Sequence, residues 1–289
     1  MNDRVSLGRI AMRNAFQVRR TLSVPREMPI NVYDVSTALG VEVRFLDRPS
    51  LEGMFYRGPQ PIVMLPSWDH RPRARIAFTC AHELGHFQLG HGTHVDEYVE
   101  SSEGRDPKSD EEFAADIFAT SLLMPRPAVL QRFSGRNWDL KNVTPHQVFI
   151  VAGELGVGYT TLIKHLRYGL ELVSHNWMKE LLRATPKLIR QELTGLSSPP
   201  DLCLVDEYWP DVPIDIEVGD AILVPPNLST SGSAVLQTVG CCGRYTCWKG
   251  KMAGLGALII GEKKYRVRVA KSGFCGLLRY RFLEDPEEK

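Results

Sequence analysis

The stretch Ala81-His82-Glu83-Leu84-Gly85-His86 constrains this chain more than any other, because it contains the pattern H-E-x-x-H. An α-helix has 3.6 residues per turn, so two histidines four residues apart lie on one face and can bind the same metal ion. The residues leading into the motif contain no helix breaker, and we expect a helix over about residues 73–90. The pattern predicts a zinc site with His82 and His86 as ligands and Glu83 as the base that takes a proton from water.

Two histidines do not complete such a site, because catalytic zinc usually takes three protein ligands and keeps a fourth position for water. The segment 109–116 provides carboxylates in a helical context. Glu112 and Asp116 are four residues apart and share a face, so we predict Glu112 as the third ligand and Asp116 as the hydrogen-bond partner that orients a ligating histidine. Glu111, and more weakly Asp110, are alternatives for the ligand. Acids at a helix start can also simply complement the helix dipole.

A peptidase site also needs a hydrogen-bond donor for the oxyanion that forms on the substrate carbonyl. Three side chains follow the motif helix, in or next to a polar loop expected over residues 92–109: His91, His94 and Tyr98. The sequence does not choose among them, and each can equally be a surface residue.

Composition excludes some classes of protein. With 43% hydrophobic and 24% charged residues, the 289-residue chain has the composition of a soluble globular protein of one large domain or two. A net charge of +1 gives no general attraction to nucleic acid or anionic membrane. No run of about 18 apolar residues occurs, so we predict no membrane span and a cytoplasmic location. The six cysteines form no regular framework, and we expect reduced thiols.

Hydrophobic periodicity and turn residues predict the order of elements. A short helix capped by Asn31, a half-exposed strand and a hairpin precede the motif helix, and a second helix ends before Pro125 because proline cannot continue it. We expect the short helix at 31–40, the strand at 41–45, the two strands of the hairpin at 53–58 and 62–65, the motif helix at 73–90 and the second helix at 110–122. Two short helices follow over 144–169, helix-turn-helix-like in outline, for which we favour packing against the core over DNA binding. A helical stretch with basic side chains continues over 172–194.

The composition changes at Ser197-Ser198-Pro199-Pro200, which has the character of a linker. Seven short apolar runs with turn residues between them follow in about ninety residues, and they predict a β-sandwich. We therefore expect an α+β chain with a mainly helical domain and small sheet at 1–196 and an all-β domain at 201–289.

Residues 29–125 resemble the ImmA/IrrE-type zinc metallopeptidases. The resemblance is carried, in matching order, by the segments 28–32, 39–43 and 53–56, by Phe78-Thr79-Cys80-Ala81-His82-Glu83-Leu84-Gly85-His86, and by Phe118-Ala119-Thr120-Ser121-Leu122-Leu123-Met124-Pro125. It implies a small zincin-like fold, one zinc ion per chain, and a glutamate ligand from the second helix. The family's usual Glu-Ala-Asn is replaced by Ala114-Ala115-Asp116, which leaves Glu112 and Glu111 both open as the ligand.

The resemblance also implies a substrate. Such endopeptidases typically cleave a helix-turn-helix transcriptional repressor encoded beside them and so derepress a stress, mobile-element or defence operon. The alternative, from another functional class, is a non-catalytic zinc-containing regulatory protein whose β-sandwich recognises a protein partner.

The C-terminal region resembles, more weakly, the chagasin-like inhibitors of cysteine proteases, which are immunoglobulin-like sandwiches. The match lies in 216–225, the loop 226–232, and the late pair 265–270 and 273–282. The loops that inhibit proteases in that family are altered here, so we expect the fold without the inhibition and a regulatory or sensor role. A thiolate at the open zinc position would hold the enzyme off, and the clustered Cys241, Cys242 and Cys247 are the candidates. The alternative is that they are buried or surface thiols. A nucleic acid or another ligand would then activate the enzyme.

Overall fold

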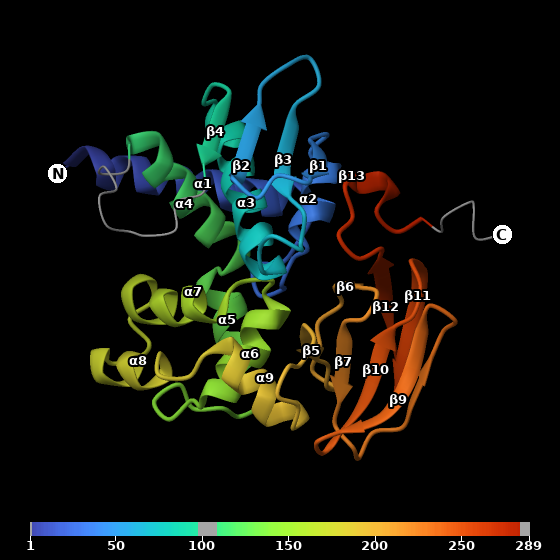
Figure 1. The fold of residues 1–289 in the computed structure, drawn as a ribbon. Helices are drawn as coiled ribbons and strands as arrows, with labels where there is room; N and C mark the ends of the chain where they lie inside the picture. The colour runs from blue at the N-terminus through green and yellow to red at the C-terminus, as the bar shows by residue number, and fades with distance from the viewer. Residues whose placement is uncertain (1, 98–108, 284–289) are drawn as a thin grey trace. The chain divides into compact units, whose positions relative to one another are not determined.

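The computed structural model describes residues 2–97 and 109–283 (Figure 1). The chain forms two compact units, called here the N-terminal and C-terminal units. The first comprises Met1–Val129, Leu155–Val157 and Gly273–Leu278, and the second comprises Leu130–Glu154, Gly158–Ser272 and Arg279–Lys289. This division does not coincide with the Ser197–Pro200 linker, and the expected domain boundary at 196–201 stays a prediction.

The N-terminal unit contains a five-stranded sheet in the order β13-β1-β3-β2-β4. The strands are β1 (Glu42–Leu46), β2 (Leu51–Tyr56), β3 (Ile62–Pro66), β4 (His94–Glu97) and β13 (Gly276–Leu277). β1 and β3 are parallel, whereas β2 is antiparallel to both β3 and β4. The sheet is completed from the far end of the sequence, because β13 pairs antiparallel with β1. The Phe274 ring packs edge-on against Phe45, with centroids 6.2 Å apart.

The helices of this unit confirm most of the sequence predictions. They are α1 (Asn2–Thr21), α2 (Val32–Ala38), α3 (Arg73–Leu89) and α4 (Asp110–Leu123). The Asn31 side chain accepts hydrogen bonds from Tyr33 N and Asp34 N and so caps α2 as expected. α3 ends at Gly90, whose φ of 80° lies in the left-handed region that favours glycine. α3 packs against β2, β3, α2 and α4, and α1 packs against α4.

The loop predicted over 92–109 was wrong for residues 94–97, which form β4. Their sequence is polar and has no strand pattern of its own, but β2 supplies backbone hydrogen-bond partners that local sequence does not reveal. The remainder of that loop, with Tyr98, lies outside the described residues.

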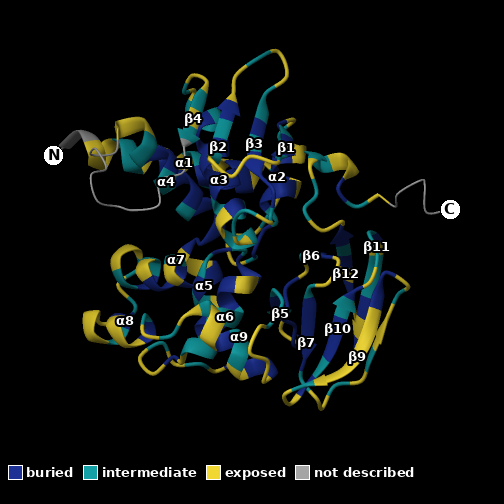
Figure 2. Cartoon of the chain, viewed as in Figure 1, coloured by how far each residue is buried: buried dark blue, intermediate teal, exposed yellow. Residues whose placement is uncertain are grey.

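The motif helix is the buried centre of the N-terminal unit, as Figure 2 shows. Phe45, Phe55 and Phe118 are completely buried around it. Among the described residues, the segment Asp110–Ser134 is long and apolar enough to cross a membrane, but 61% of its most apolar window is buried inside the protein, as expected for helices in a core. Pro125 interrupts this segment between α4 and α5 (Arg126–Ser134).

The C-terminal unit begins with helices and ends in strands. The helices are α6 (Pro145–Glu154), α7 (Tyr159–Lys164), the π-helical segment η1 (His165–Gly169), α8 (His175–Leu181) and α9 (Pro186–Thr194). The helical stretch predicted over 172–194 is two helices, because Thr185 caps α9 and Pro186 opens it. A one-turn 3₁₀-helix, η2 (Leu278–Tyr280), follows β13 near the end of the described chain.

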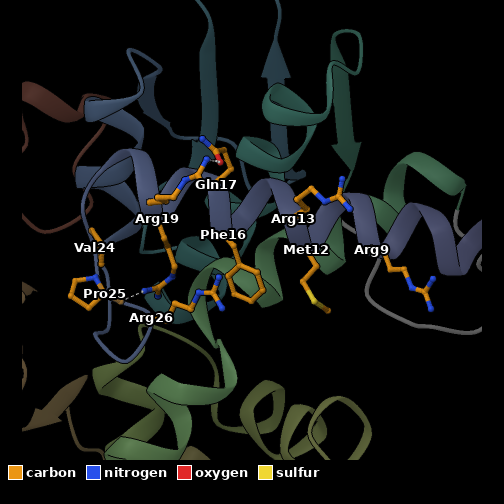
Figure 3. Close-up of a pocket in the computed structure, with 10 residues that line it drawn as sticks. Arg9, Met12, Arg13, Phe16, Gln17, Arg19, Val24, Pro25 and Arg26 are labelled. Carbon is orange, nitrogen blue, oxygen red and sulfur yellow. Dashed lines mark hydrogen bonds between the residues drawn. The ribbon is translucent and has the colours of Figure 1, made fainter.

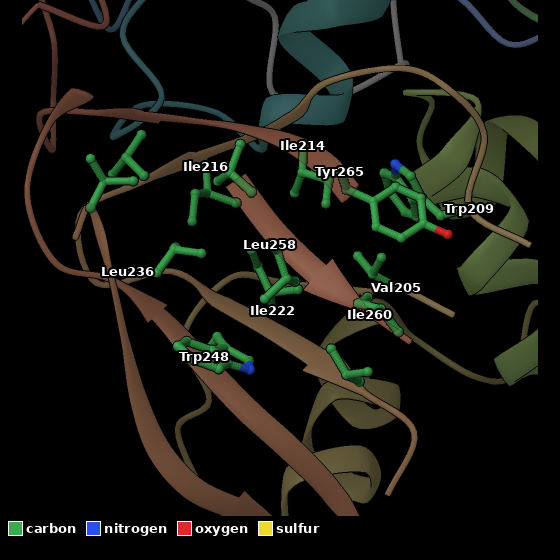
Figure 4. Close-up of a cluster of buried hydrophobic side chains, with 14 residues drawn as sticks. Val205, Trp209, Ile214, Ile216, Ile222, Leu236, Trp248, Leu258, Ile260 and Tyr265 are labelled. Carbon is green, nitrogen blue, oxygen red and sulfur yellow. The ribbon is translucent and has the colours of Figure 1, made fainter. Parts of the chain in front are cut away.

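Two four-stranded sheets form the β part of this unit, with orders β5-β7-β10-β9 and β6-β12-β11-β8. Their side chains meet in one apolar core, to which Ile222 and Trp248 contribute from the first sheet and Ile216 and Leu258 from the second (Figure 4). β8 and β10 were not predicted, and the other six strands occupy expected runs. The seventh predicted run, 277–282, forms no strand of these two sheets: its first residue belongs to β13 of the N-terminal sheet, and η2 follows. The bounds are β5 (Leu202–Leu204), β6 (Ile214–Glu217), β7 (Ala221–Val224), β8 (Thr230–Gly232), β9 (Leu236–Cys242), β10 (Tyr245–Gly250), β11 (Gly254–Ile260) and β12 (Lys263–Ala270). The predicted α+β class is confirmed, and the chagasin-like resemblance stays a prediction.

Candidate metal centre

The close approach of two helices creates the site. A Cβ atom on Gly85 would lie 3.1 Å from Ala115 Cα and 3.2 Å from Ala115 O, so a glycine in the middle of α3 lets α4 pack directly against it. Ser109 caps α4 by accepting a hydrogen bond from Glu112 N. Glu112 and Asp116, one turn apart on α4, are thereby brought to His82 and His86.

Three predicted ligands converge on one position. His82 Nε2 and His86 Nε2 lie 3.1 Å apart, and Glu112 places Oε1 3.1 Å from His86 Nε2 and Oε2 3.3 Å from His82 Nε2. Of the alternatives for the third ligand, Glu111 is exposed, and Asp110 is paired with Arg4 instead. The structure therefore assembles His82, His86 and Glu112, with Glu112 favoured over Glu111 as the third ligand.

The donor set fits zinc. Bond lengths of about 2.0–2.2 Å to nitrogen and oxygen place neighbouring tetrahedral ligands roughly 3.3–3.5 Å apart. The two histidine nitrogens lie 3.1 Å apart, and each has a different Glu112 oxygen near it, Oε1 at 3.1 Å from His86 and Oε2 at 3.3 Å from His82, which is close to that value. In addition, Glu112 Oε1 is buried and accepts no well-aligned hydrogen bond within the described part of the chain. Two imidazoles and one carboxylate are ligands that zinc takes in catalytic sites, where a fourth position stays open.

Glu83 lies next to these three donors. One of its carboxylate oxygens, a ring nitrogen of His82 and a carboxylate oxygen of Asp96 all lie within 4.8 Å of one another. Its side chain is completely buried, and neither carboxylate oxygen has a hydrogen-bond partner among the described residues. Burial raises the pKa of Glu83 to about 8, reinforced by the charges of Asp96 and Glu112 and opposed by His82. A carboxylate with a pKa near neutrality is well suited to accept and return a proton.

The outer nitrogens of both histidines are also engaged. His82 Nδ1 lies 3.1 Å from Asp116 Oδ1, which is the contact predicted for Asp116. His86 Nδ1 lies 2.9 Å from His91 Nδ1. If His86 binds a metal through Nε2, its Nδ1 carries the hydrogen and His91 accepts it. Burial, together with the charge of His86, lowers the pKa of His91, which keeps that ring neutral and able to accept. His91 is thus placed to orient a ligand, and the oxyanion role considered for it from the sequence stays a prediction.

Charge couples His82 to Glu112. Burial by itself lowers the pKa of His82, but hydrogen bonds with Asp116 and Glu112 outweigh it and raise that pKa to about 10. Burial likewise opposes ionisation of Glu112, but its close contacts with the His82 and His86 rings hold the pKa of Glu112 well below its usual range. A metal ion that binds His82 Nε2 must therefore displace a proton.

Two further residues come from β4. His94 Nε2 lies 3.0 Å from Glu112 Oε1 and 2.9 Å from Asp96 Oδ1, and the His94 ring stacks on His86 with centroids 4.5 Å apart. His94 was considered from the sequence as an oxyanion donor, and the structure directs its Nε2 at two carboxylates. Asp96 was missed. The only signal for it was the alternation His94-x-Asp96, which places both side chains on one face once a strand forms.

The three cysteines considered as inhibitory thiols lie in the C-terminal unit. Cys241 is exposed on β9, whose exposed face is visible in Figure 2, and Cys242 is half-buried. Cys247 is completely buried on β10. Burial and a hydrogen bond with Cys242 raise the pKa of Cys247 to about 12, so its thiolate is disfavoured. Of the three, Cys241 is the accessible candidate, and inhibition by a thiol stays a prediction.

Replacing Glu112 with Gln is expected to weaken zinc binding by more than roughly 100-fold. Loss of a residue that only hydrogen-bonds to a ligand typically weakens it by roughly 10–100-fold, and here a ligand itself is lost. Metal content after dialysis, measured by mass spectrometry, checks this. Glu111→Gln is the matched control, since Glu111 is exposed on the same turn of α4 and should retain zinc fully. Equal zinc content in the two variants would show that Glu112 is not a ligand.

Gly53 on β2 leaves room for the carboxylate of Glu83, the base predicted from the sequence. A Cβ atom at this position would lie 2.5 Å from Glu83 Oε1 and 2.5 Å from Thr79 Cγ2. Gly53→Ala should therefore displace the Glu83 carboxylate and lower turnover roughly 100-fold, the effect expected of a shift near 1 Å, while zinc stays bound. Gly92→Ala is the control, because nothing lies within 4 Å of a Cβ atom there. Unchanged turnover in Gly53→Ala would show that Glu83 does not need this space.

A separate pocket of about 530 Å³ lies beside α1 and the turn that follows it (Figure 3). Arg9, Arg13, Arg20 and Arg26 line it, and the Arg26 guanidinium lies 4.7 Å from the centroid of the Phe16 ring. This cationic lining suits an anionic ligand. The residues of the metal centre do not line this pocket.

Comparison with known proteins agrees with this geometry. Residues 37–167 match the sequence model of the IrrE N-terminal-like domain, peptidase M78. Comparison with curated proteins finds no match to the chain. The matched residues run from the end of α2 into η1 and include α3 and α4 with the convergent histidines and glutamate. This family implies a metal ion, typically zinc, and the described residues include histidines and a glutamate placed to bind one. The match over residues 37–167 therefore supports a metallopeptidase of the IrrE N-terminal-like type.

Proposed function

We propose that this chain is a cytoplasmic zinc endopeptidase that cleaves a helix-turn-helix transcriptional repressor and so derepresses a stress, mobile-element or defence operon. One observation supports catalysis above all. A buried carboxylate without a hydrogen-bond partner, that of Glu83, lies next to a three-donor set that fits zinc. The repressor as substrate rests on the resemblance to the ImmA/IrrE-type peptidases.

Different side chains of this protein have different roles in peptide hydrolysis. Zinc held by His82, His86 and Glu112 would polarise the scissile carbonyl and lower the pKa of water. Glu83 takes the proton from the attacking water and later passes it to the leaving amine. Asp116 and His91 hold the two histidines in the tautomer that directs Nε2 to the metal.

The edge of the sheet offers a place for an extended substrate. β4 is the last strand in the sheet, and within the described residues it pairs only with β2. An internal stretch of polypeptide can add to such an edge by backbone hydrogen bonds. Because His94 and Asp96 belong to β4 and contact the metal centre, a peptide bound there would pass the catalytic groups. This arrangement supports endopeptidase activity over removal of terminal residues.

Regulation by the C-terminal region belongs to the same proposal. In this scheme the β-sandwich holds the enzyme off until a nucleic acid or another ligand shifts the population toward an active form. Two of the basic side chains in the 172–194 region are already neutralised, because Arg183 pairs with Glu180 and Arg190 with Asp201. The arginine-lined pocket beside α1 is a second cationic surface for such a ligand.

The alternative is a non-catalytic zinc-containing regulatory protein whose β-sandwich binds a protein partner. A structural zinc site has four protein ligands and needs no general base. The unpartnered Glu83 carboxylate therefore favours catalysis over this alternative.

Cleavage of the helix-turn-helix repressor encoded beside this chain tests the proposal. Purified wild-type protein, with and without added DNA, is incubated with that repressor, and fragments are identified by mass spectrometry. We expect cleavage by the wild type and none by Glu83→Gln. Zinc-loaded protein that leaves the repressor intact in every condition, including with Cys241→Ala, would overturn the proposed substrate.

A further inference from the structure

The edge strand β4 brings additional metal-binding side chains to the catalytic cluster. It lies antiparallel to β2, with His94 opposite Phe55 and Asp96 opposite Gly53. Because side chains alternate along a strand, His94 and Asp96 share one face. That face contacts the metal centre, since Asp96 Oδ2 lies 3.6 Å from His82 Nε2 and His94 Nε2 lies 3.0 Å from Glu112 Oε1.

Three of these groups form a donor set of their own. His94 Nε2 lies 2.9 Å from Asp96 Oδ1 and 3.0 Å from Glu112 Oε1, and ligand-type atoms of the three residues all lie within 4.8 Å of one another. Neither motif histidine belongs to this set. The three side chains are 30, 26 and 18% exposed, so they are partly shielded from water and still open to an entering ion. One imidazole and two carboxylates suit a divalent ion such as Zn²⁺ or Mn²⁺.

Counting ligands favours a separate ion over additional ligands for the first one. A catalytic zinc takes three protein ligands, which His82, His86 and Glu112 already supply, and keeps its fourth position open.

The Glu112 carboxylate has the geometry of a bridge. Its Oε1 lies near His86 and His94, and its Oε2 lies near His82. In two-metal sites, ions roughly 3.5–4 Å apart share ligands in this way and act on one substrate. We propose that His94, Asp96 and Glu112 form a second divalent metal site, with Glu112 bridging it to the first. The proposal rests on the proposed first site only through Glu112. It also places a metal ion's positive charge at His94, which the sequence suggested as an oxyanion donor.

The stoichiometry of metal binding tests this. The full chain, stripped with a chelator and desalted, is titrated with Zn²⁺ by calorimetry, and bound metal is counted by mass spectrometry. We expect two ions per wild-type chain, and one in His94→Gln and in Asp96→Asn. His70→Gln is the matched control, because His70 makes the same kind of contact with a carboxylate, 2.7 Å to Asp47 Oδ1, outside the cluster. It should retain two ions.

A second variant separates this inference from the proposed function. His82→Gln should lose the first ion and keep the one at His94. If the wild type binds one ion, and this ion is kept in His94→Gln but lost in His82→Gln, the second site is overturned and the first stands. If His82→Gln binds as many ions as the wild type, the first site is overturned. Circular dichroism identifies any variant that fails to fold, and Asp96→Asn, which keeps the shape of the side chain, then carries the test.

Discussion

Glu83→Gln is expected to lower turnover by about 100- to 10,000-fold, the range in which general acid–base groups contribute, while zinc remains bound. The amide keeps the shape of the carboxylate but cannot accept a proton from water. Nothing in the fold should change, because within the described residues no hydrogen bond holds either oxygen of Glu83. Burial raises the pKa of Glu83 to about 8, so the wild-type activity should increase as pH rises toward that value.

Metal content and cleavage of the repressor, measured on the same preparations, check this expectation. His70→Gln serves again as a control with a changed histidine–carboxylate contact outside the centre. Equal turnover in Glu83→Gln and wild type, with equal zinc, would exclude Glu83 as the base and favour the non-catalytic alternative.

Arg136→Met is expected to lower the free energy of unfolding of the C-terminal unit by about 3–5 kcal/mol, the usual effect of leaving buried charges without a partner. Arg136 donates to both oxygens of Asp206, at 2.6 and 2.9 Å, and to both oxygens of Glu154. The Glu154 side chain is completely buried, and the Asp206 side chain is 12% exposed. Methionine fills a similar volume but removes the guanidinium that contacts both carboxylates, and Arg132 is then the nearby positive charge that remains.

The loss should depend on pH with a definite sign. Burial raises the pKa of Glu154 to about 7 even beside Arg136, and removing the arginine raises it further. A carboxyl group whose pKa is higher in the folded than in the unfolded state lowers stability as pH rises from the unfolded pKa to the folded one. The loss in Arg136→Met should therefore be larger at pH 8 than at pH 5, where the Glu154 carboxyl group is protonated.

Denaturant unfolding followed by tryptophan fluorescence measures this, because four of the five tryptophans belong to the C-terminal unit. Arg183→Met is the control: Arg183 pairs with Glu180 at 2.7 Å on an exposed surface and should cost no more than about 0.5 kcal/mol. A loss below about 1 kcal/mol in Arg136→Met at pH 8 would show that the unit does not need this buried cluster.

Local sequence patterns determined much of this protein. The four-residue spacing of His82 and His86 depends only on helix geometry, and it placed both rings on one face. Asn31, Gly40 and Pro125 marked element ends through capping, a positive φ and the missing N–H of proline, which are properties of one residue and its neighbours. The four-residue spacing of Glu112 and Asp116 predicted their shared face for the same reason.

Only the tertiary structure decided what depends on long-range contacts. A polar segment became β4 because β2 offered it backbone partners, and this brought Asp96 to the metal centre. Glu112 was separated from Glu111 by the packing of α4 on α3 at Gly85, and not by residue type. The contact between His91, which follows the end of α3, and the outer nitrogen of His86 was visible only in the folded chain. Spacing along a helix is encoded in a few adjacent residues, whereas strand pairing and helix packing depend on partners far away in the chain, whose identity no local pattern contains.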